Sequence, residues 1–285
     1  ASTQHGFPPK RTMGIAQKLY EGVDLGEGPV GLITYMRTDS FTVSQDAIAA
    51  CRGMVTEKFG PDYCPEKPNY YKSKASAQEA HEAIRPADVC RTPESLAQYL
   101  DPSELKVYTL VWTRFVASQM TPAVIERRTV KVDALPPQSQ DTRYLFLASA
   151  SQVKFAGYMK VTGLDLRKKE KEEEEEEEQI PELAVGESLD LVEWEKERKE
   201  TQPPRRFSEA SLIRALESNG VGRPSTYAQI ISTLLDRLYT VKENKVLVPT
   251  PRGRKVSELM TSSLGELFDV WVTALMEDQL DNVEK

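Results

Sequence analysis

The sequence predicts a multidomain α+β fold in three consecutive parts, and three observations support it. Apolar residues recur at helical spacing over residues 1–121, but from Ala123 they alternate with a period of two. At Pro203-Pro204 the composition becomes basic and helical spacing returns. A chain of 285 residues, 39% of them hydrophobic, is long enough for two or three domains with separate cores. We therefore predict domains at 1–121, 122–202 and 203–285.

The first part is predicted to be mainly helical. Helices are expected over Thr12–Tyr20 and from the capping residue Ser44 to Lys58, with Gly22–Gly31 as a loop. Asp101-Pro102-Ser103-Glu104 is typical of a helix start. Apolar and aromatic side chains follow it at helical spacing: Leu105, Tyr108, Trp112, Phe115, Val116 and Met120. We interpret this stripe as core rather than as a platform for stacking bases.

The second part is predicted to be rich in β-structure. Its alternating segments predict antiparallel strands at four places: Thr129–Asp133, Arg143–Ala148, Lys154–Val161 and Ser188–Trp194. An acidic insertion, 165–179, interrupts them and ends in a run of glutamates. Because this insertion is too charged to pack, we predict that it is solvated and disordered. Repulsion of DNA or recruitment of a basic partner is the less favoured alternative.

The third part is predicted to contain two helices followed by a β-hairpin. Ser208 would cap a helix over Glu209–Ser218, and the hydroxyls of the turn Gly222–Thr226 would cap a second over Tyr227–Leu238. Strands are expected near Tyr239–Lys242 and Lys245–Val248, an order typical of a winged-helix-like module. The tail Pro251–Lys285 is predicted to form two helices with these core residues: Val256, Leu259, Leu267, Phe268 and Leu275.

The net charge of −7 is unevenly distributed along the chain. Asp165–Glu200 holds sixteen acidic and seven basic residues, a net of −9, whereas Gln202–Ser257 holds ten basic and four acidic residues, a net of +6. The overall acidity therefore does not exclude a nucleic-acid partner. No apolar run is long enough to span a bilayer. Three cysteines without metal-ligand spacing indicate reduced, inert thiols.

The ten residues Gly31–Ser40, GLITYMRTDS, contain the strongest chemical signal. If the segment is extended, Tyr35 and Arg37 lie on the same side and face one ligand. A phenol can attack a phosphodiester while a guanidinium contacts the phosphate oxygens. On the residues alone, the simpler alternative is strand-edge packing plus a surface charge.

Two further motifs accompany this segment: Gln78–Pro86 (QEAHEAIRP) and Pro204–Ile231 (PRRFSEASLIRALESNGVGRPSTYAQII). Together the three resemble the type IA DNA topoisomerases, in the bacterial topoisomerase I form. The resemblance spans nearly the whole chain except the charged insertion. It implies a helical arch carrying the active-site tyrosine, a β-rich hinge and a winged-helix-like DNA-binding domain.

The resemblance also implies an activity and a set of site residues. Tyr35 would be the nucleophile, with Arg37 and His81 contacting the scissile phosphate and Arg85 structural. The implied reaction is ATP-independent relaxation of negatively supercoiled DNA through transient single-strand cleavage, a 5′-phosphotyrosine, strand passage and religation. A phenol with the ordinary pKa of ~10 is protonated at neutral pH, so the reaction also needs a proton acceptor.

A second set of residues is expected to contact DNA. Arg223, Ser225 and Thr226 crowd a predicted helix N-terminus, where free backbone N–H groups bind phosphate. A plain capped helix is the alternative, and the family resemblance favours DNA contact. The weaker candidates are Arg205, Arg206 and Arg237.

The resemblance implies Mg²⁺ bound by an acidic Toprim domain, which would precede Ala1. The sequence contains no Asp-x-Asp-x-Asp triad, so we predict no metal ligands here. We expect the chain to be part of a longer polypeptide, and by itself to bind DNA with little or no cleavage. One alternative is a non-catalytic module that binds single-stranded DNA, and another is a structural DNA scaffold. The expected protein is a monomer in a bacterial cytoplasm or nucleoid, or in a eukaryotic organelle.

Overall fold

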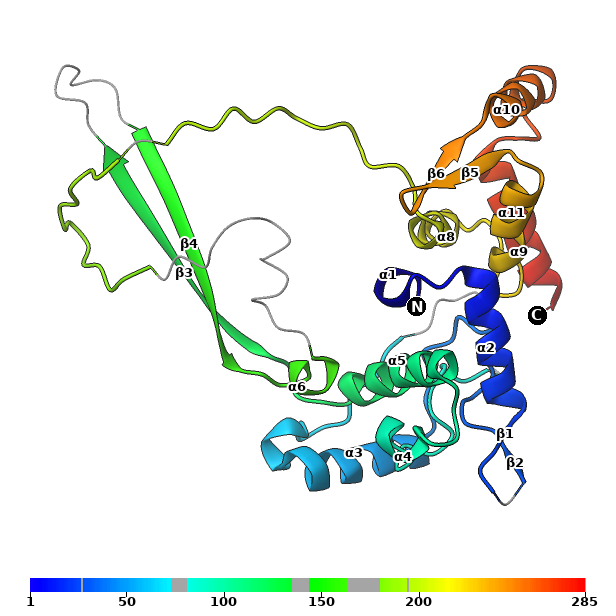
Figure 1. The fold of residues 1–285 in the computed structure, drawn as a ribbon, viewed down its shortest axis with the longest axis horizontal. Helices are drawn as coiled ribbons and strands as arrows, with labels where there is room; N and C mark the ends of the chain where they lie inside the picture. The colour runs from blue at the N-terminus through cyan, green and yellow to red at the C-terminus, as the bar shows by residue number, and fades with distance from the viewer. Residues whose placement is uncertain (27, 73–80, 135–143, 164–179, 194, 285) are drawn as a thin grey trace.

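The computed structural model describes residues 1–26, 28–72, 81–134, 144–163, 180–193 and 195–284, and it shows a mixed α+β chain (Figure 1). The elements of the N-terminal half are α1 Ser2–His5, α2 Pro9–Glu21, β1 Val23–Asp24, β2 Pro29–Val30, α3 Gln45–Phe59, η1 Pro61–Tyr63, α4 Pro93–Leu96, α5 Pro102–Ser118 and β3 Val124–Ala134. The later elements are β4 Tyr144–Phe155, α6 Met159–Thr162, α8 Glu209–Ser218, α9 Tyr227–Asp236, β5 Thr240–Glu243, β6 Val246–Pro249, α10 Pro251–Ser263 and α11 Val270–Glu284.

Helices α2, α3 and α5 enclose the main hydrophobic core. The predicted aromatic stripe of α5 is buried there, with Trp112 only 3% exposed and Tyr108 fully buried. Both rings also satisfy their polar atoms, since Trp112 Nε1 donates to the carbonyl of Val89 (2.8 Å) and the Tyr108 hydroxyl donates to that of Arg91 (2.6 Å). The prediction that this stripe forms core is confirmed.

The predicted helix starts are confirmed because each capping residue acts within one turn. Ser44 accepts from the N–H of Ala47 at the start of α3. Asp101 accepts from the N–H of Glu104 (3.0 Å), and the Glu104 carboxylate accepts from the N–H of Asp101, which makes a capping box. Ser208 forms the corresponding contact with Ser211 in α8.

In the middle of the chain the described residues form one long hairpin rather than four strands. Strands β3 and β4 pair antiparallel from Val124↔Phe155 to Ala134↔Tyr144 and project away from the helices (Figure 1). The predicted strand Lys154–Val161 is wrong: the extended chain ends at Phe155, and α6 follows. Gly157 has φ 49°, and a Cβ there would lie 2.4 Å from the carbonyl oxygen of Thr121, so the chain turns where the strand was expected to continue.

Three other predictions, for residues outside this hairpin, have different outcomes. No strand forms at the described residues 188–193, where the backbone has neither helix nor strand structure. Alternation alone does not make a strand unless a second strand supplies the ladder partners. The acidic insertion 165–179 lies outside the described residues. The predicted loop Gly22–Gly31 contains the two-residue strands β1 and β2.

The C-terminal elements follow the predicted order of helix, helix, hairpin and two helices. The turn between β5 and β6 lies at Asn244-Lys245, both with positive φ, one residue beyond its predicted place. The predicted core of the tail is wrong, because Leu259 and Leu267 are 61% and 64% exposed and Phe268 and Leu275 are also exposed, while Val256 is half-buried. Apolar spacing identifies a helix face but not whether another element covers it.

The C-terminal elements contact the main helical core through its first helices. Helix α2 packs against α9, and α1 packs against α8 (Figure 1). This contact brings α9 close to the segment that contains Tyr35. None of the helices in the described part of the chain is long and apolar enough to cross a membrane.

Candidate active site

The tyrosine segment Gly31–Ser40 is extended only at its start. Ile33 forms an isolated antiparallel bridge with Pro86, and the backbone then bends at Met36 and Arg37. Met36 is buried (4% exposed), whereas Arg37 is exposed. The predicted strand through Tyr35 and Arg37 is therefore wrong, because the buried Met36 side chain anchors a bend there. That the two side chains face one ligand stays a prediction.

Residues 81–86 of the second motif lie alongside the tyrosine segment, and its residues 78–80 lie outside the described part of the chain. The N–H of Thr34 donates to the carbonyl of Arg85 (2.9 Å), and the N–H of Ala87 donates to that of Leu32 (2.9 Å). The expected short helix or turn between His81 and Pro86 does not form. Its backbone groups instead pair with the tyrosine segment, which satisfies them without a helix.

This pairing brings the two predicted reactive side chains together. The rings of Tyr35 and His81 have centroids 5.6 Å apart and planes inclined at 31°. Tyr20 of α2 contacts Tyr35 from another direction, with centroids 5.5 Å apart and an interplanar angle of 67°. Tyr35 and His81 are both half-buried, and Arg37 lies exposed at the adjacent bend. A phenol and an imidazole thus share a site that remains open to solvent.

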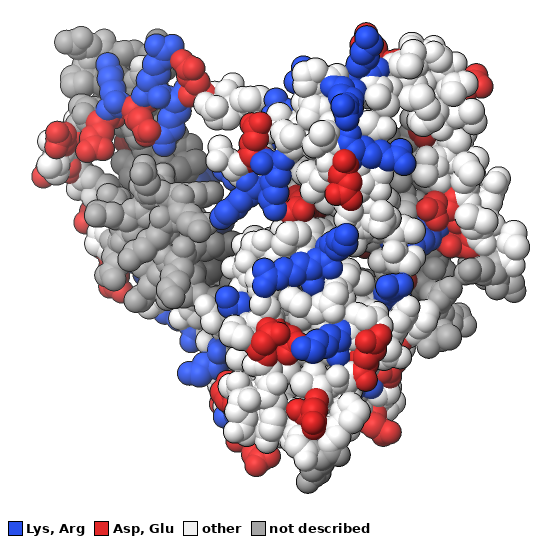
Figure 2. Space-filling model, turned by 45° about the vertical axis from the view of Figure 1, so that its right-hand side comes forward, with Lys and Arg blue, Asp and Glu red and all other residues white. Residues whose placement is uncertain are grey.

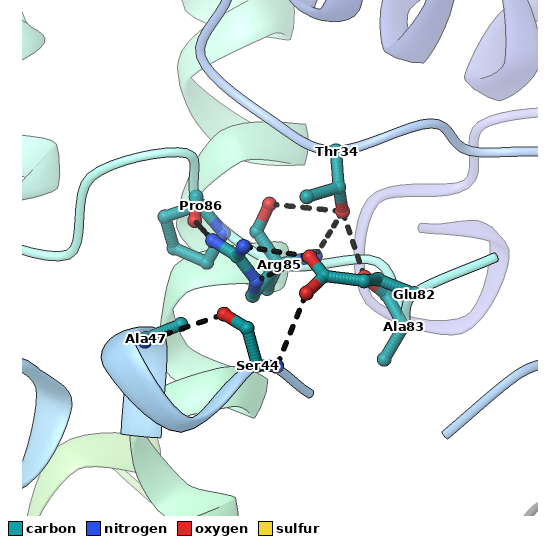
Figure 3. A network of polar contacts seen from close by, with 7 residues as sticks. All are labelled: Thr34, Ser44, Ala47, Glu82, Ala83, Arg85 and Pro86. Carbon is teal, nitrogen blue, oxygen red and sulfur yellow. Dashed lines mark hydrogen bonds and ion pairs between the residues drawn. The ribbon is translucent and has the colours of Figure 1, made fainter. Parts of the chain in front are cut away.

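A polar network fixes the two segments beside each other (Figure 3). The Thr34 hydroxyl donates to the carbonyl of Ala83 (2.7 Å) and accepts from the N–H of Arg85 (2.9 Å). The Glu82 carboxylate accepts from the N–H of Ser44 (3.1 Å) and pairs with the Arg85 guanidinium (2.6 Å). Arg85 therefore makes the structural contacts expected of it. The sequence assigned no role to Thr34 or Glu82, because Thr34 bonds to Ala83, 49 residues away, and Glu82 to Ser44, 38 residues away.

The expected DNA-contact residue Arg223 faces carboxylates in this structure. Its Nη2 lies 2.7 Å from an oxygen of Asp281 and its Nη1 lies 3.5 Å from one of Glu277, both on α11. Burial by itself lowers the pKa of Arg223, but the hydrogen bond and charge of Asp281, with Glu277, raise it overall. The guanidinium is thus held by anionic oxygens at the position where a phosphate is predicted to bind.

The other candidates for DNA contact are exposed. Ser225 and Thr226 lie before α9, and the Thr226 hydroxyl accepts from the N–H of Arg223 (2.9 Å). The prediction that hydroxyls cap α9 is wrong, because the side chain of Thr226, the residue at the helix N-cap, closes the preceding turn instead. The remaining exposed candidates are Arg205, Arg206 and Arg237.

The tyrosine segment also lies near the start of α9. Burial raises the pKa of the Tyr227 phenol, and the carboxylates of Glu217 and Asp39 raise it further. Asp39 belongs to the same motif as Tyr35, and α2, whose Tyr20 contacts Tyr35, packs against α9. In Figure 2, Lys and Arg side chains recur across the upper and central parts of the visible face, with Asp and Glu interspersed.

The described residues do not fit a metal ion. In this part of the chain, no three His, Cys, Asp or Glu side chains come close enough together to hold one.

Comparison with known proteins places the whole chain in one group. Residues 1–285 match the family described as DNA topoisomerase. The chain is 43% identical over 287 residues to DNA topoisomerase 1 of Xylella fastidiosa, covering 100% of this chain and 34% of the relative. It is 42% identical over 284 residues to DNA topoisomerase 1 of Campylobacter jejuni, covering 99% of this chain and 38% of that relative.

A solved structure agrees with these matches. Full-length topoisomerase I from Thermotoga maritima superposes with a TM-score of 0.84 at 37% identity, covering 100% of this chain and 44% of that one. The chain thus spans between 34% and 44% of the length of these three proteins.

Proposed function

We propose that this chain, which belongs to the type IA DNA topoisomerase family in its bacterial topoisomerase I form, carries the strand-cleaving tyrosine of such an enzyme. The observation that supports this most is the pairing of Tyr35 with His81 across two segments distant in sequence. The complete activity would be ATP-independent relaxation of negatively supercoiled DNA.

The proposed reaction is a transesterification. The Tyr35 oxygen attacks a backbone phosphorus of single-stranded DNA, a tyrosine O–P bond forms, and the bond from phosphorus to the 3′-oxygen breaks. The phenol loses its proton and the 3′-oxygen gains one, leaving a 5′-phosphotyrosine and a free 3′-hydroxyl. After strand passage, attack by that hydroxyl reverses each step. One phosphate ester replaces another, so no nucleoside triphosphate is consumed.

His81 and Arg37 have the chemistry to stabilise this transfer. A guanidinium offers planar N–H donors to phosphate oxygens, and an imidazole at the phenol can donate to the phosphate or hold a proton. The half-buried Tyr35–His81 contact and the exposed position of Arg37 support these roles. We infer that Mg²⁺, where the reaction uses it, is held by an acidic Toprim domain outside these residues.

The other parts of the chain would guide the DNA. In this proposal residues 1–121 form the helical arch, 122–202 the hinge, and 203–285 a winged-helix-like domain that contacts single-stranded DNA. Arg223, Ser225 and Thr226 would contact its phosphates, with Arg205, Arg206 and Arg237 contributing. Helix α9 of this domain packs against α2, whose Tyr20 contacts Tyr35, and this proximity supports the proposal. We infer a monomer that acts in the bacterial cytoplasm or nucleoid.

Covalent trapping tests the proposal. The chain, and the longer polypeptide that we propose carries it, are incubated with 5′- and 3′-end-labelled single-stranded DNA and Mg²⁺, then denatured. Tyr35→Phe should abolish a covalent adduct at the 5′-phosphate. Tyr20→Phe is the matched control, because Tyr20 contacts the Tyr35 ring and loses the same atom. It should leave the adduct in place.

The outcomes separate the proposal from its alternatives. An adduct in the longer polypeptide that Tyr35→Phe removes and Tyr20→Phe does not supports the proposed cleavage by Tyr35. Salt-sensitive binding of single-stranded DNA without any adduct in either protein would instead identify a non-catalytic binding module. An adduct with the 285-residue chain alone would contradict our expectation that the acidic domain is required.

A further inference from the structure

We propose that Thr34 and Glu82 are positioning residues that set the distance between Tyr35 and His81. This rests on the proposed function in taking Tyr35 and His81 as the reacting pair. The Thr34 hydroxyl and the Glu82 carboxylate lie next to that pair in sequence, and each bonds to a different segment of the chain (Figure 3).

The Thr34 hydroxyl acts as both donor and acceptor. It donates to the carbonyl of Ala83, 49 residues away (2.7 Å), and accepts from the N–H of Arg85 (2.9 Å). The backbone N–H of Thr34 also donates to the Arg85 carbonyl (2.9 Å). One side chain therefore satisfies two backbone groups of the histidine motif. A valine of nearly the same shape would satisfy neither.

Glu82 attaches the histidine motif to a third element. Its carboxylate accepts hydrogen bonds from the N–H of Ser44 at the start of α3 and from the Nε and Nη2 of Arg85 (3.1 and 2.6 Å). The Arg85 side chain is 13% exposed and that of Glu82 33% exposed, so water screens this pair only in part. Since α3 contributes buried side chains to the main core, Glu82 connects the histidine motif to that core.

These contacts restrict the position of His81 because it is only two residues from Ala83, which they hold in place. Ala83 is held at both backbone groups, since its N–H donates to the carbonyl of Thr42 (2.8 Å) and its carbonyl accepts from Thr34. Two residues of chain span at most ~7 Å, so this anchor limits where the imidazole can lie. Tyr35 follows Thr34 directly. The same hydroxyl thus restrains both rings of the pair.

Nuclear magnetic resonance of the 285-residue chain gives a readout independent of catalysis. The chain contains two histidines, His5 and His81, and the His5 ring lies 5.7 Å from Phe7, which makes it an internal reference. In Thr34→Val we expect loss of the Tyr35–His81 ring cross-peak and a shifted His81 imidazole signal, with His5 unchanged. Thr34→Ser should restore both.

Matched controls exclude a general loss of stability. Thr109→Val removes a half-buried hydroxyl that donates to the carbonyl of Leu105 (2.7 Å) within α5, and Glu126→Gln removes the charge of an exposed carboxylate on β3. Both should leave the His81 signal in place. Glu82→Gln should shift it less than Thr34→Val, because the amide oxygen still accepts from Ser44. An unchanged His81 signal in both Thr34→Val and Glu82→Gln overturns the proposal.

Kinetics on the longer polypeptide then connect the contact to the reaction. Thr34→Val should slow single-turnover adduct formation and resealing alike by about tenfold or more, with the Kd for single-stranded DNA unchanged. In a His81→Ala background the same substitution should cost clearly less than in the wild type, since only the restraint on Tyr35 is then lost. An equal loss in that background would contradict positioning through His81.

The two experiments fail separately. A wild-type protein that forms no adduct but whose His81 signal responds to Thr34→Val retains the positioning contact and refutes the proposed function. Adduct formation with an unresponsive His81 signal supports the proposed function and overturns the positioning role of Thr34 and Glu82.

Discussion

Replacement of Asp281 by Asn tests whether α11 competes with DNA for Arg223. The Arg223 guanidinium makes two contacts to the Asp281 carboxylate, Nε to Oδ1 at 3.3 Å and Nη2 to Oδ2 at 2.7 Å. A phosphate that bound the same N–H donors would have to displace this carboxylate. Asp281→Asn should therefore strengthen binding of single-stranded DNA, even though it removes a contact from the folded protein.

The magnitude follows from the contacts. Charge-assisted hydrogen bonds contribute about 1.5–3 kcal/mol, but Arg223 and Asp281 are 26% and 19% exposed and Glu277 remains nearby. We therefore expect the lower end, about 1.5 kcal/mol, which lowers Kd slightly more than tenfold. Fluorescence anisotropy with a labelled oligonucleotide at fixed salt measures it.

A control substitution is available on the same helix, α11. Asp278→Asn makes the same change at an exposed position of α11 and should shift Kd much less. Arg223→Ala should weaken binding and reduce the slope of log K against log salt by about 0.7, one phosphate contact on a single strand. If Asp281→Asn binds no more tightly than wild type, α11 does not compete with DNA.

Three further predictions concern the folded chain. Asp101→Ala should lower the free energy of unfolding in urea by about 1 kcal/mol by removing the capping box of α5. The hydrogen bond from the backbone N–H of Glu104 lowers the pKa of Asp101. The stabilisation is therefore present above the unfolded-state pKa near ~3.9 and is lost as the pH falls below that value. Asp101→Asn should flatten this loss of stability in acid, and an unchanged acid profile would contradict the prediction. Burial raises the pKa of Cys51 to about 12, so iodoacetamide should label the exposed Cys90 first and Cys51 last. Mass spectrometry measures the labelling rates, and equal rates would refute this order. Gly157→Ala should destabilise the chain by more than about 1 kcal/mol, and Gly163→Ala, with similar positive φ but no atom within 4 Å of its new Cβ, should cost clearly less in the same thermal melt.

Long-range contacts explain which parts of the prediction failed. The strand expected at Lys154–Val161 ends early because Gly157 lies against the backbone of Thr121 and Pro122, which no local pattern reveals. The tail helices form where they were expected, but Leu259 of α10 and Leu275 of α11, predicted as core, are exposed. Periodicity reports the polarity of a helix face, and only the arrangement of neighbouring elements decides its burial.

The candidate site divides in the same way. The motifs around Tyr35 and His81 predict these two as the reactive side chains, since their chemistry is a property of residue type. The Thr34 and Glu82 contacts could not be predicted, because the hydroxyl and carboxylate meet partners in other segments. The same holds for Arg223, whose carboxylate partner Asp281 lies 58 residues along the chain.

The amino-acid sequence by itself determined where the helices begin and which residue types are available for attack on phosphate. Caps such as Ser44, Asp101 and Ser208 act within a single turn, so local sequence is sufficient for them. Only the tertiary structure decided that the Tyr35 ring lies 5.6 Å from that of His81 and that Arg223 meets α11. Those distances depend on how separate segments pack, because a hydrogen bond between distant residues forms only after the core has brought their backbones together.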